Sequence, residues 1–413
     1  MPGAPGGVRP PLSPDRRAGG PALDRRAGGP ASRGRAWRSR RLDPSGGGGG
    51  ASPHAGVPGR ADPRGAPRLL TLDGSHGEGG GQILRTALAL AVARRVPLTL
   101  TRIRARRPKP GLQPQHLTVV RALAAISDAE VKGDGLDSTE LTFLPRTLRG
   151  GSYRFDVGAV KASAGSVSLL FQALLLPLAL APTESRLTRL GGTHVPWSPP
   201  VHYLTEVFLP ALRQIGVEAR LTLKRWGWYP AGGGEVEATI VPARQLSPFR
   251  PQASGTLTAI RGLSAVSRLP RSIAERQRER ALERLSAAGL AAEIAVQEDA
   301  TARGPGTLLF LAVPGRAGFS ALGRRGVPAE RVADEAVEAL LAYRGSGALV
   351  DDRLADQLMP FLALAREASL FTSPALSSHL QTAAWVVQQF LPTRIDLDAG
   401  PPARVRITPP PAA

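Results

Sequence analysis

Hydrophobic and polar positions along the chain alternate with two different periods from about residue 68 onward. Stretches with an apolar residue at every second position predict strands, and stretches with apolar residues three or four positions apart predict helices. These stretches follow one another as strand, helix, strand, helix, strand, strand, and the series occurs three times. A repeated βαβαββ unit indicates a domain in which each unit packs two helices against a small sheet.

Six helices are expected, two in each unit. Their predicted ranges are 81–95, 114–127, 164–181, 199–216, 352–367 and 377–392. The third unit begins with a strand over 255–263, but its first helix begins only at residue 352. The third unit is therefore interrupted by a long insertion.

The insertion, residues 265–343, has its own order of helix, strand, strand and helix. This order predicts a small α/β domain inserted into the third unit. The expected fold class is therefore α/β (α+β), with a large domain made of three βαβαββ repeats over residues 68–264 and 344–413.

Residues 1–67 differ in composition from the rest of the chain. They contain the doubled segment DRRAGGPA (15–22 and 24–31), a run of five glycines and many prolines. Such a segment cannot bury enough apolar surface to offset its chain entropy, so we expect a disordered tail. An over-long start of the reading frame, or a tail that contacts RNA through its arginines, are the alternatives.

The formal net charge is +20, of which the first 67 residues contribute +8. This excess of basic residues favours a polyanion as partner. The absence of cysteine excludes disulfides and thiolate metal sites and is compatible with the cytoplasm, where we expect the protein. The longest apolar run, LLFQALLLPLALA, contains a Gln and a Pro, so no membrane span is expected.

The stretch DGSHGEGGGQILR (73–85) places five glycines in eight positions between a predicted strand and a predicted helix. Glycine lets backbone amides approach a ligand closely, and a helix N-terminus favours phosphate. The stretch matches neither GxxxxGK[ST] nor GxGxxG, so a tight strand-to-helix turn is an equal alternative. A carboxylate beside phosphates needs a cation between them, which makes Glu78 a candidate ligand of Mg²⁺ or Mn²⁺. An acidic residue that merely stabilises the helix N-terminus is the other interpretation.

A basic loop follows the next predicted strand, in TRIRARRPKPGLQPQHL (101–117). Arg104 and Arg107 in this loop suit contacts with phosphate, although such runs are usually solvated surface. Arg85 lies within the apolar helix segment ILRTALAL and needs a partner, because an unpaired buried charge is unfavourable. Gln172 lies midway along another apolar helix, where a satisfied buried amide is the commoner interpretation.

His379 lies in the first turn of the last predicted helix, which Ser377 or Ser378 is expected to cap. A helix N-terminus disfavours imidazolium, and a neutral imidazole is a nucleophile with an available lone pair. Asp356 or Gln357, on the preceding helix, could orient this ring through its other nitrogen. On spacing alone an ordinary first-turn histidine is the commoner interpretation, and neither GxSxG nor HExxH is present.

Taken together and in order, these motifs resemble those of the RNA 3′-terminal phosphate cyclase family. They are LDGSHGEGGGQILRTALAL, IRARRPKPGL, SAGS, GGTHVPWSPP, LADQL and SSHL, and they extend over residues 68–410. The resemblance implies a large domain of three βαβαββ units with an insert in the third. It also implies an ATP-dependent reaction on an RNA 3′-phosphate, through histidyl-AMP and RNA(3′)pp(5′)A, that leaves a 2′,3′-cyclic phosphate.

Matching positions to the family's motifs assigns roles to single residues. The nucleophile falls on His379, and the ligand of Mg²⁺ or Mn²⁺ on Glu78. The arginines that bind phosphate or the RNA end fall on Arg85, Arg104 and Arg107. The nucleotide-pocket positions fall on Gln172, Pro199, Asp356 and Gln357.

Two positions depart from the family's pattern. Arg353 stands where an aromatic residue is common, and its guanidinium plane could stack on adenine in place of a ring. His76 stands where glutamine is common, and an imidazole so close to Glu78 could alter the metal preference.

Two other functions share this architecture. A non-catalytic cyclase-like protein that binds RNA in ribosome assembly would lack the histidine of SSHL, which this chain retains as His379. An enolpyruvyl transferase, which acts on small phosphorylated acids, needs no nucleophilic histidine. The sequence does not predict the oligomeric state.

Overall fold

The computed structural model describes residues 69–160, 164–252 and 260–410. The predicted tail of residues 1–67 lies outside the described residues.

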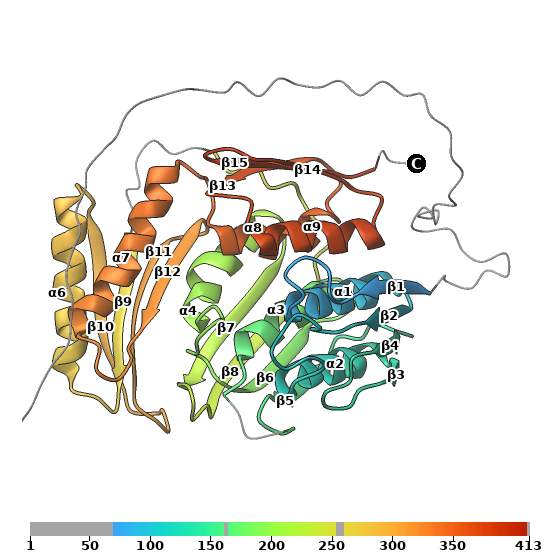
Figure 1. Ribbon diagram of the computed structural model, residues 1–413, viewed down its shortest axis with the longest axis horizontal. Coiled ribbons are helices and arrows are strands. Elements are labelled where there is room, and N and C mark those ends of the chain that lie inside the picture. Colours follow the sequence, from blue (N-terminus) through green and yellow to red (C-terminus); the bar gives the residue numbers. More distant parts are fainter. Residues whose placement is uncertain (1–68, 161–163, 253–259, 411–413) are drawn as a thin grey trace, which may run out of the picture. The chain divides into compact units, whose positions relative to one another are not determined.

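The first unit has the predicted order of elements and forms one four-stranded sheet (Figure 1). Its elements are β1 (Leu70–Asp73), α1 (Gly81–Arg94), β2 (Leu98–Thr101), α2 (Pro114–Ser127), β3 (Glu130–Lys132) and β4 (Leu141–Leu144). The strand order is β1-β2-β4-β3, with β1 parallel to β2 and the other neighbours antiparallel.

The second unit repeats this topology, with the strand order β5-β6-β8-β7. Its elements are β5 (Ser152–Asp156), α3 (Val167–Ala179), β6 (Ser185–Gly191), α4 (Val201–Tyr203), the π-helical η1 (Leu204–Phe208), α5 (Leu209–Gln214), β7 (Glu218–Arg225) and β8 (Gly234–Val241). The parallel pair is β5 and β6, in the place of β1 and β2. The identical strand order supports the repeat that the hydrophobic pattern predicts.

The third unit differs from the prediction in its first strand. Its sheet has the order β13-β15-β14, built from β13 (Ser369–Ser373), β14 (Arg394–Asp398) and β15 (Ala403–Thr408), with helices α8 (Asp352–Leu362) and α9 (Ser378–Phe390). The strand expected over 255–263 is described from residue 260, as β9 (Ile260–Ser267), and it pairs along its whole length within the inserted domain. Its assignment to the third sheet is therefore wrong for the described part. An apolar strand pattern does not specify which sheet provides its partners.

The inserted domain has four strands where two were expected, because it contains β9 and a further strand, β12. Its elements after β9 are α6 (Arg271–Ala287), β10 (Ala292–Asp299), β11 (Gly306–Val313), β12 (Ala317–Leu322) and α7 (Ala329–Ser346). The strand order is β10-β9-β11-β12, and α6 and α7 pack side by side on this sheet (Figure 1). The missed strand β12 has the sequence AGFSAL, whose small residues have weak strand propensity.

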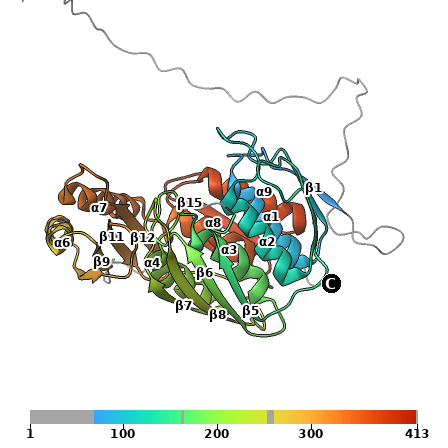
Figure 2. The same ribbon diagram turned by 90° about the horizontal axis from the view of Figure 1, so that it is seen from below.

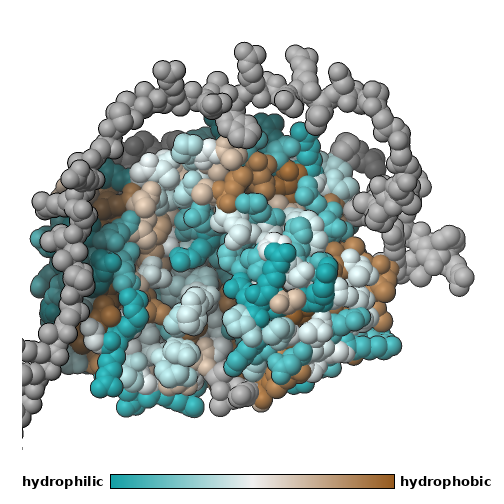
Figure 3. Space-filling model, viewed as in Figure 1, coloured by the Kyte–Doolittle hydropathy of each residue, from teal (hydrophilic) through white to brown (hydrophobic). Residues whose placement is uncertain are grey.

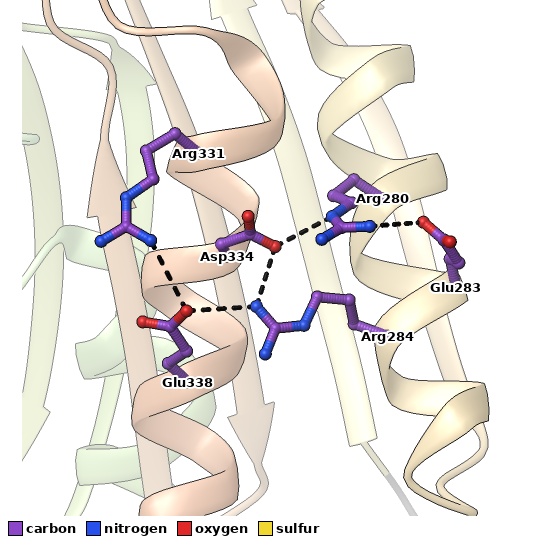
Figure 4. A network of polar contacts seen from close by, with 6 residues as sticks. All are labelled: Arg280, Glu283, Arg284, Arg331, Asp334 and Glu338. Carbon is purple, nitrogen blue, oxygen red and sulfur yellow. Dashed lines mark hydrogen bonds and ion pairs between the residues drawn. The ribbon is translucent and has the colours of Figure 1, made fainter.

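Ion pairs connect the outer surfaces of α6 and α7 (Figure 4), on a side of the molecule that is strongly hydrophilic (Figure 3). Asp334 accepts hydrogen bonds from Arg280 and Arg284, both at 2.9 Å. Burial alone raises the pKa of Asp334, but the hydrogen bonds from Arg284 and Arg280 outweigh it and hold that pKa below its ordinary value. The network therefore stabilises the folded insert while Asp334 is ionised.

Four helices of the large domain pack on one another and carry the functional residues. Helix α1 contacts α3 and α9, and α8 contacts α9 (Figures 1 and 2). Leu88, Leu174, Leu358 and Val386 of these helices are fully buried. This packing brings the first repeat next to the third. No helix in the described part of the chain is both long and apolar enough to cross a membrane.

Replacing Asp334 by Ala should lower the free energy of unfolding by about 1 kcal/mol, because two arginines lose a shared, partly buried carboxylate. Chemical denaturation at neutral pH measures this change. Glu283→Ala is the control, because Glu283 binds Arg280 from a position that is 68% exposed and should have no measurable effect. The folded-state pKa of Asp334 lies below the ordinary pKa of an aspartate. The difference in stability between wild type and Asp334→Ala should therefore disappear as the pH falls below the ordinary pKa and through the folded-state pKa. A difference that persists in acid would contradict this assignment.

Candidate functional site

The glycine-rich loop between β1 and α1 lies against one side of α9. Gly77 has a φ of +53°, and a Cβ there would collide with Thr382 Oγ1. His76 stacks on Trp385 with ring centroids 3.9 Å apart and planes 12° apart. Glycine is required at position 77 both for the backbone conformation and for this close approach. The His76 ring is therefore held on Trp385, and the idea that it alters the metal preference of Glu78 gains no support from its position.

His379 lies at the start of α9, as predicted, and Ser377 caps the helix by accepting a hydrogen bond from Leu380 N at 3.1 Å. The Nδ1 atom of His379 is 2.6 Å from Gln82 Oε1. The other end of the same amide, Gln82 Nε2, donates to Asp356 Oδ2 at 2.6 Å. One series of hydrogen bonds therefore joins α9, α1 and α8.

This series selects a tautomer of His379. An amide oxygen can only accept, so Nδ1 of the neutral ring must carry the proton. The lone pair is then on Nε2, which points away from Gln82 and lies 3.6 Å from Glu78 Oε2. The imidazole is 51% exposed, so Nε2 is available as a nucleophile.

The expectation that Asp356 or Gln357 orients His379 directly is wrong. Asp356 acts through Gln82, and the Oε1 atom of Gln357 has no hydrogen-bond partner among the described residues. Gln82 is 297 residues away from His379 in sequence, so helix periodicity gives no indication of their contact.

Glu78 lies in the glycine loop and not on α1, which begins at Gly81. Its carboxylate is 14% exposed and forms an ion pair with Arg107 of the basic loop. Arg106 Nη1 donates to Gly77 O at 2.9 Å, so two arginines bind the glycine loop. Arg104 instead donates to Lys109 O at 2.5 Å and Gly111 O at 3.1 Å, which stabilises its own loop.

Arg85 on α1 and His116 on α2 both lie close to Gly81 at the start of α1. Burial lowers the pKa of Arg85 to about 10, although Glu78 and Asp356 attract its charge, so it remains a cation at neutral pH. Burial, with the charges of Arg85 and Arg104, lowers the pKa of His116 to about 3. His116 is therefore neutral.

His116 was not predicted from the sequence. Its Nδ1 accepts a hydrogen bond from Gln113 N at 3.2 Å, so its Nε2 carries the proton. A Cβ at Gly81 would collide with His116 Nε2 and press on Arg85 Nη1, which places both groups at the mouth of α1. The capping-box position of His116, three residues after the N-cap Gln113 of α2, was the available signal.

A cavity beside this series of hydrogen bonds is lined by residues of α1, α3 and α8, including Gln82, Arg85, Gln172, Asp356 and Gln357. Gln172 Nε2 and Gln357 Oε1 are buried without a hydrogen-bond partner in the described part of the chain. Buried polar groups are normally paired, so a free donor and a free acceptor beside one cavity indicate a polar ligand.

Two predicted pocket residues lie elsewhere. Pro199 is buried immediately before Pro200, the N-cap residue of α4, and Arg353 is exposed in the first turn of α8. Neither lines the cavity.

The carboxyl group of Asp356 is unusual for an aspartate. Burial raises the pKa of Asp356 to about 8, with a contribution from the charge of Asp351 and opposing ones from Arg85 and Arg353. A neutral carboxyl group still has an oxygen that accepts from Gln82, so the series of hydrogen bonds is compatible with either state.

Glu78 is the acidic residue nearest to the nucleophile candidate. The described residues contain no group of three or more His, Cys, Asp and Glu side chains that could hold a metal ion. A single carboxylate nevertheless fits Mg²⁺, which keeps several waters and is commonly bound by one or two carboxylates together with substrate phosphates.

Comparison with known proteins gives consistent matches. The family described as RNA 3′-terminal phosphate cyclase matches residues 76–397. An RNA 3′-terminal phosphate cyclase from Methylococcus capsulatus is 49% identical over 338 residues, which cover 80% of this chain and 93% of the relative. Proteins of the same name from Gloeothece citriformis and Methanopyrus kandleri are 45% and 41% identical, over 80% and 83% of this chain and 96% and 99% of their own lengths.

The tautomer of His379 can be observed by ¹⁵N NMR of the imidazole at a pH where the ring is neutral. We expect Nδ1 to carry the proton. Gln82→Leu removes the acceptor and should return the ring to the mixture of tautomers seen in free histidine. A ring of the wild-type protein protonated on Nε2 would contradict the proposed orientation.

The pH dependence of stability should report Asp356. Its folded-state pKa lies above the unfolded value, so the proton it retains stabilises the folded protein at low pH, and this contribution is lost as the pH rises toward and through about 8. The melting temperature of the wild type should therefore fall as the pH rises from about 4 to about 8, and Asp356→Asn should reduce the slope. Equal slopes in the two proteins would show that Asp356 ionises normally.

Proposed function

Because the chain belongs to the RNA 3′-terminal phosphate cyclase family, we propose that His379 carries the AMP group while an RNA 3′-phosphate is converted to a 2′,3′-cyclic phosphate with ATP as co-substrate. The single observation that carries this assignment is the hydrogen bond between His379 Nδ1 and Gln82, which leaves the Nε2 lone pair free. A scaffold without catalysis has no need of this orientation.

The first step transfers AMP to the protein. His379 Nε2 attacks the α-phosphorus of ATP, an N–P bond forms, and the bond to pyrophosphate breaks. Pyrophosphate leaves with much negative charge, so the step needs cations that face the phosphates. Arg85 and Arg107 supply positive charge within this site, beside the glycine-rich start of α1.

Arg104 has a different supporting part in this proposal. Its hydrogen bonds to Lys109 O and Gly111 O hold the basic loop in shape, so it positions Arg107. Both bonds use Nη1, so the other guanidinium nitrogens of Arg104 remain available as donors to phosphate.

Glu78 is the residue that would hold Mg²⁺ or Mn²⁺. A bound divalent ion would neutralise charge on the phosphate oxygens. The carboxylate is paired with Arg107 and lies 3.6 Å from His379 Nε2. A phosphate group would compete with Glu78 for Arg107, and a metal ion would compete with Arg107 for Glu78. Binding of either one would therefore break the Glu78–Arg107 ion pair.

The orphan amide atoms support a nucleobase pocket. Adenine offers both acceptor nitrogens and an amino donor, which complement Gln172 Nε2 and Gln357 Oε1. Asp356 lies beside them in the cavity wall. Pro199 and Arg353 lie outside this wall.

The later steps use positioning more than new chemistry. The AMP group passes from His379 to an oxygen of the RNA 3′-phosphate, which breaks the N–P bond and forms RNA(3′)pp(5′)A. The ribose 2′-OH then attacks the adjacent activated phosphorus, AMP leaves, and the cyclic ester closes. Because the attacking hydroxyl is already beside the phosphorus, the site needs mainly to hold the RNA end in place.

We also propose that the large domain carries the whole reaction and that the insert, predicted over 265–343 and running from β9 to α7 in the structure, contributes stability or RNA contacts. The cytoplasm is the compartment proposed for this reaction. The positive net charge of +20 favours an RNA partner.

The proposal is tested by incubating the protein with α-³²P-ATP and Mg²⁺. We expect label on the protein that is stable in alkali and labile in acid, and its complete loss in His379→Ala. Glu78→Gln should raise the Mg²⁺ concentration for half-maximal labelling about tenfold or more. Gln381→Ala, exposed on the same helical turn, is the matched control and should label normally.

The second stage of this test supplies an oligonucleotide with a 3′-phosphate. RNA should give a phosphatase-resistant cyclic end, whereas DNA should be adenylylated at most because it has no 2′-OH. A labelled His379→Ala protein, or a cyclic product on DNA, would refute the assigned chemistry.

A further inference from the structure

The His76–Trp385 stack is not used by the chemistry described above. Trp385 is partly buried and packs on the core, whereas His76 is exposed. The two rings are nearly parallel, so the indole covers one face of the imidazole. The other face is open to solvent, two residues from Glu78.

The position of this stack along α9 relates it to the nucleophile. Six residues separate Trp385 from His379, which corresponds to about 9 Å along the helix. That separation is comparable to the reach of a single nucleotide from its base to its 3′-phosphate. Arg106 donates to the carbonyl of Gly77, beside His76, and Arg107 pairs with the neighbouring Glu78. Two arginines therefore bind the loop that joins the exposed ring to Glu78.

We propose that the open face of His76 is a stacking platform for the terminal nucleobase of the RNA whose 3′-phosphate reacts at His379; this inference rests on the proposed function. Trp385 holds the imidazole flat and excludes water from its inner face. Aromatic stacking accepts any of the four bases, which suits an enzyme that acts on an end rather than on a sequence. His76 is then a specificity residue for nucleic-acid ends that carry a base.

A purely structural function is the competing explanation. In that case the stack fixes the glycine loop on α9, and its loss would disturb Glu78 and every step that depends on it. The two explanations differ in whether the step that uses ATP alone is affected.

The test compares the wild type with His76→Ala and His76→Phe on two 3′-phosphorylated oligoribonucleotides, one normal and one with an abasic 3′-terminal ribose. Both substrates retain the reacting 2′-OH and 3′-phosphate. We expect His76→Ala to raise the KM for the normal RNA about tenfold, within the range for stacking of one base, and to leave the KM for the abasic RNA unchanged. His76→Phe keeps a ring and should remain close to the wild type. Labelling by ATP alone should be the same in all three proteins.

Three results would overturn the platform. An equal loss on both RNAs, no loss on either, or a matching loss of labelling by ATP alone would each mean that His76 makes no contact with the base. A wild-type protein that took no label from ATP would instead overturn the proposed function. The labelling assay therefore tests the proposed function, and the comparison of the two RNAs tests the stacking platform.

Discussion

One amide side chain, that of Gln82, determines the geometry of the site. It has a donor end and an acceptor end, and each has a single partner, Asp356 on α8 and His379 on α9. The donor and acceptor ends of the amide are not interchangeable. The hydrogen bond to Asp356 therefore sets the orientation of the amide, and the amide oxygen sets the tautomer of the imidazole. The packing of α1 against α9, and of α9 against α8, holds these three groups within hydrogen-bond distance.

Electrostatics around this series explain why the ligand must be anionic. Arg85, Arg106 and Arg107 face the glycine loop, and Glu78 is paired with one of them. Burial lowers the pKa of Arg85 without removing its charge, so part of the positive charge has no close counter-ion in the described structure. A phosphate group would relieve this imbalance.

The sequence predicted those features that depend on local pattern. The start of α9 was predicted to within one residue because Ser377 caps it, whereas α3 begins three residues later than predicted. The roles of His379 and Glu78 were assigned from the ordered set of motifs and not from helix spacing. Features that depend on tertiary pairing were missed, because β9 could have joined either sheet and the Gln82–His379 contact spans 297 residues. The short strand β12 was missed because its small residues have weak strand propensity, and the neutral state of His116 was missed because it depends on burial beside Arg85 and Arg104.

The contacts on α9 also restrict how the site can move. His379, Thr382 and Trp385 lie on one side of the helix, and each meets a different part of the segment from His76 to Gln82. A shift of α9 along its axis would break all three contacts together, because each depends on the same register. The imidazole of His379 and the carboxylate of Glu78 therefore keep their relative positions. Ligand-driven changes are then expected in the side chains of the basic loop, above all Arg107, rather than in the helices.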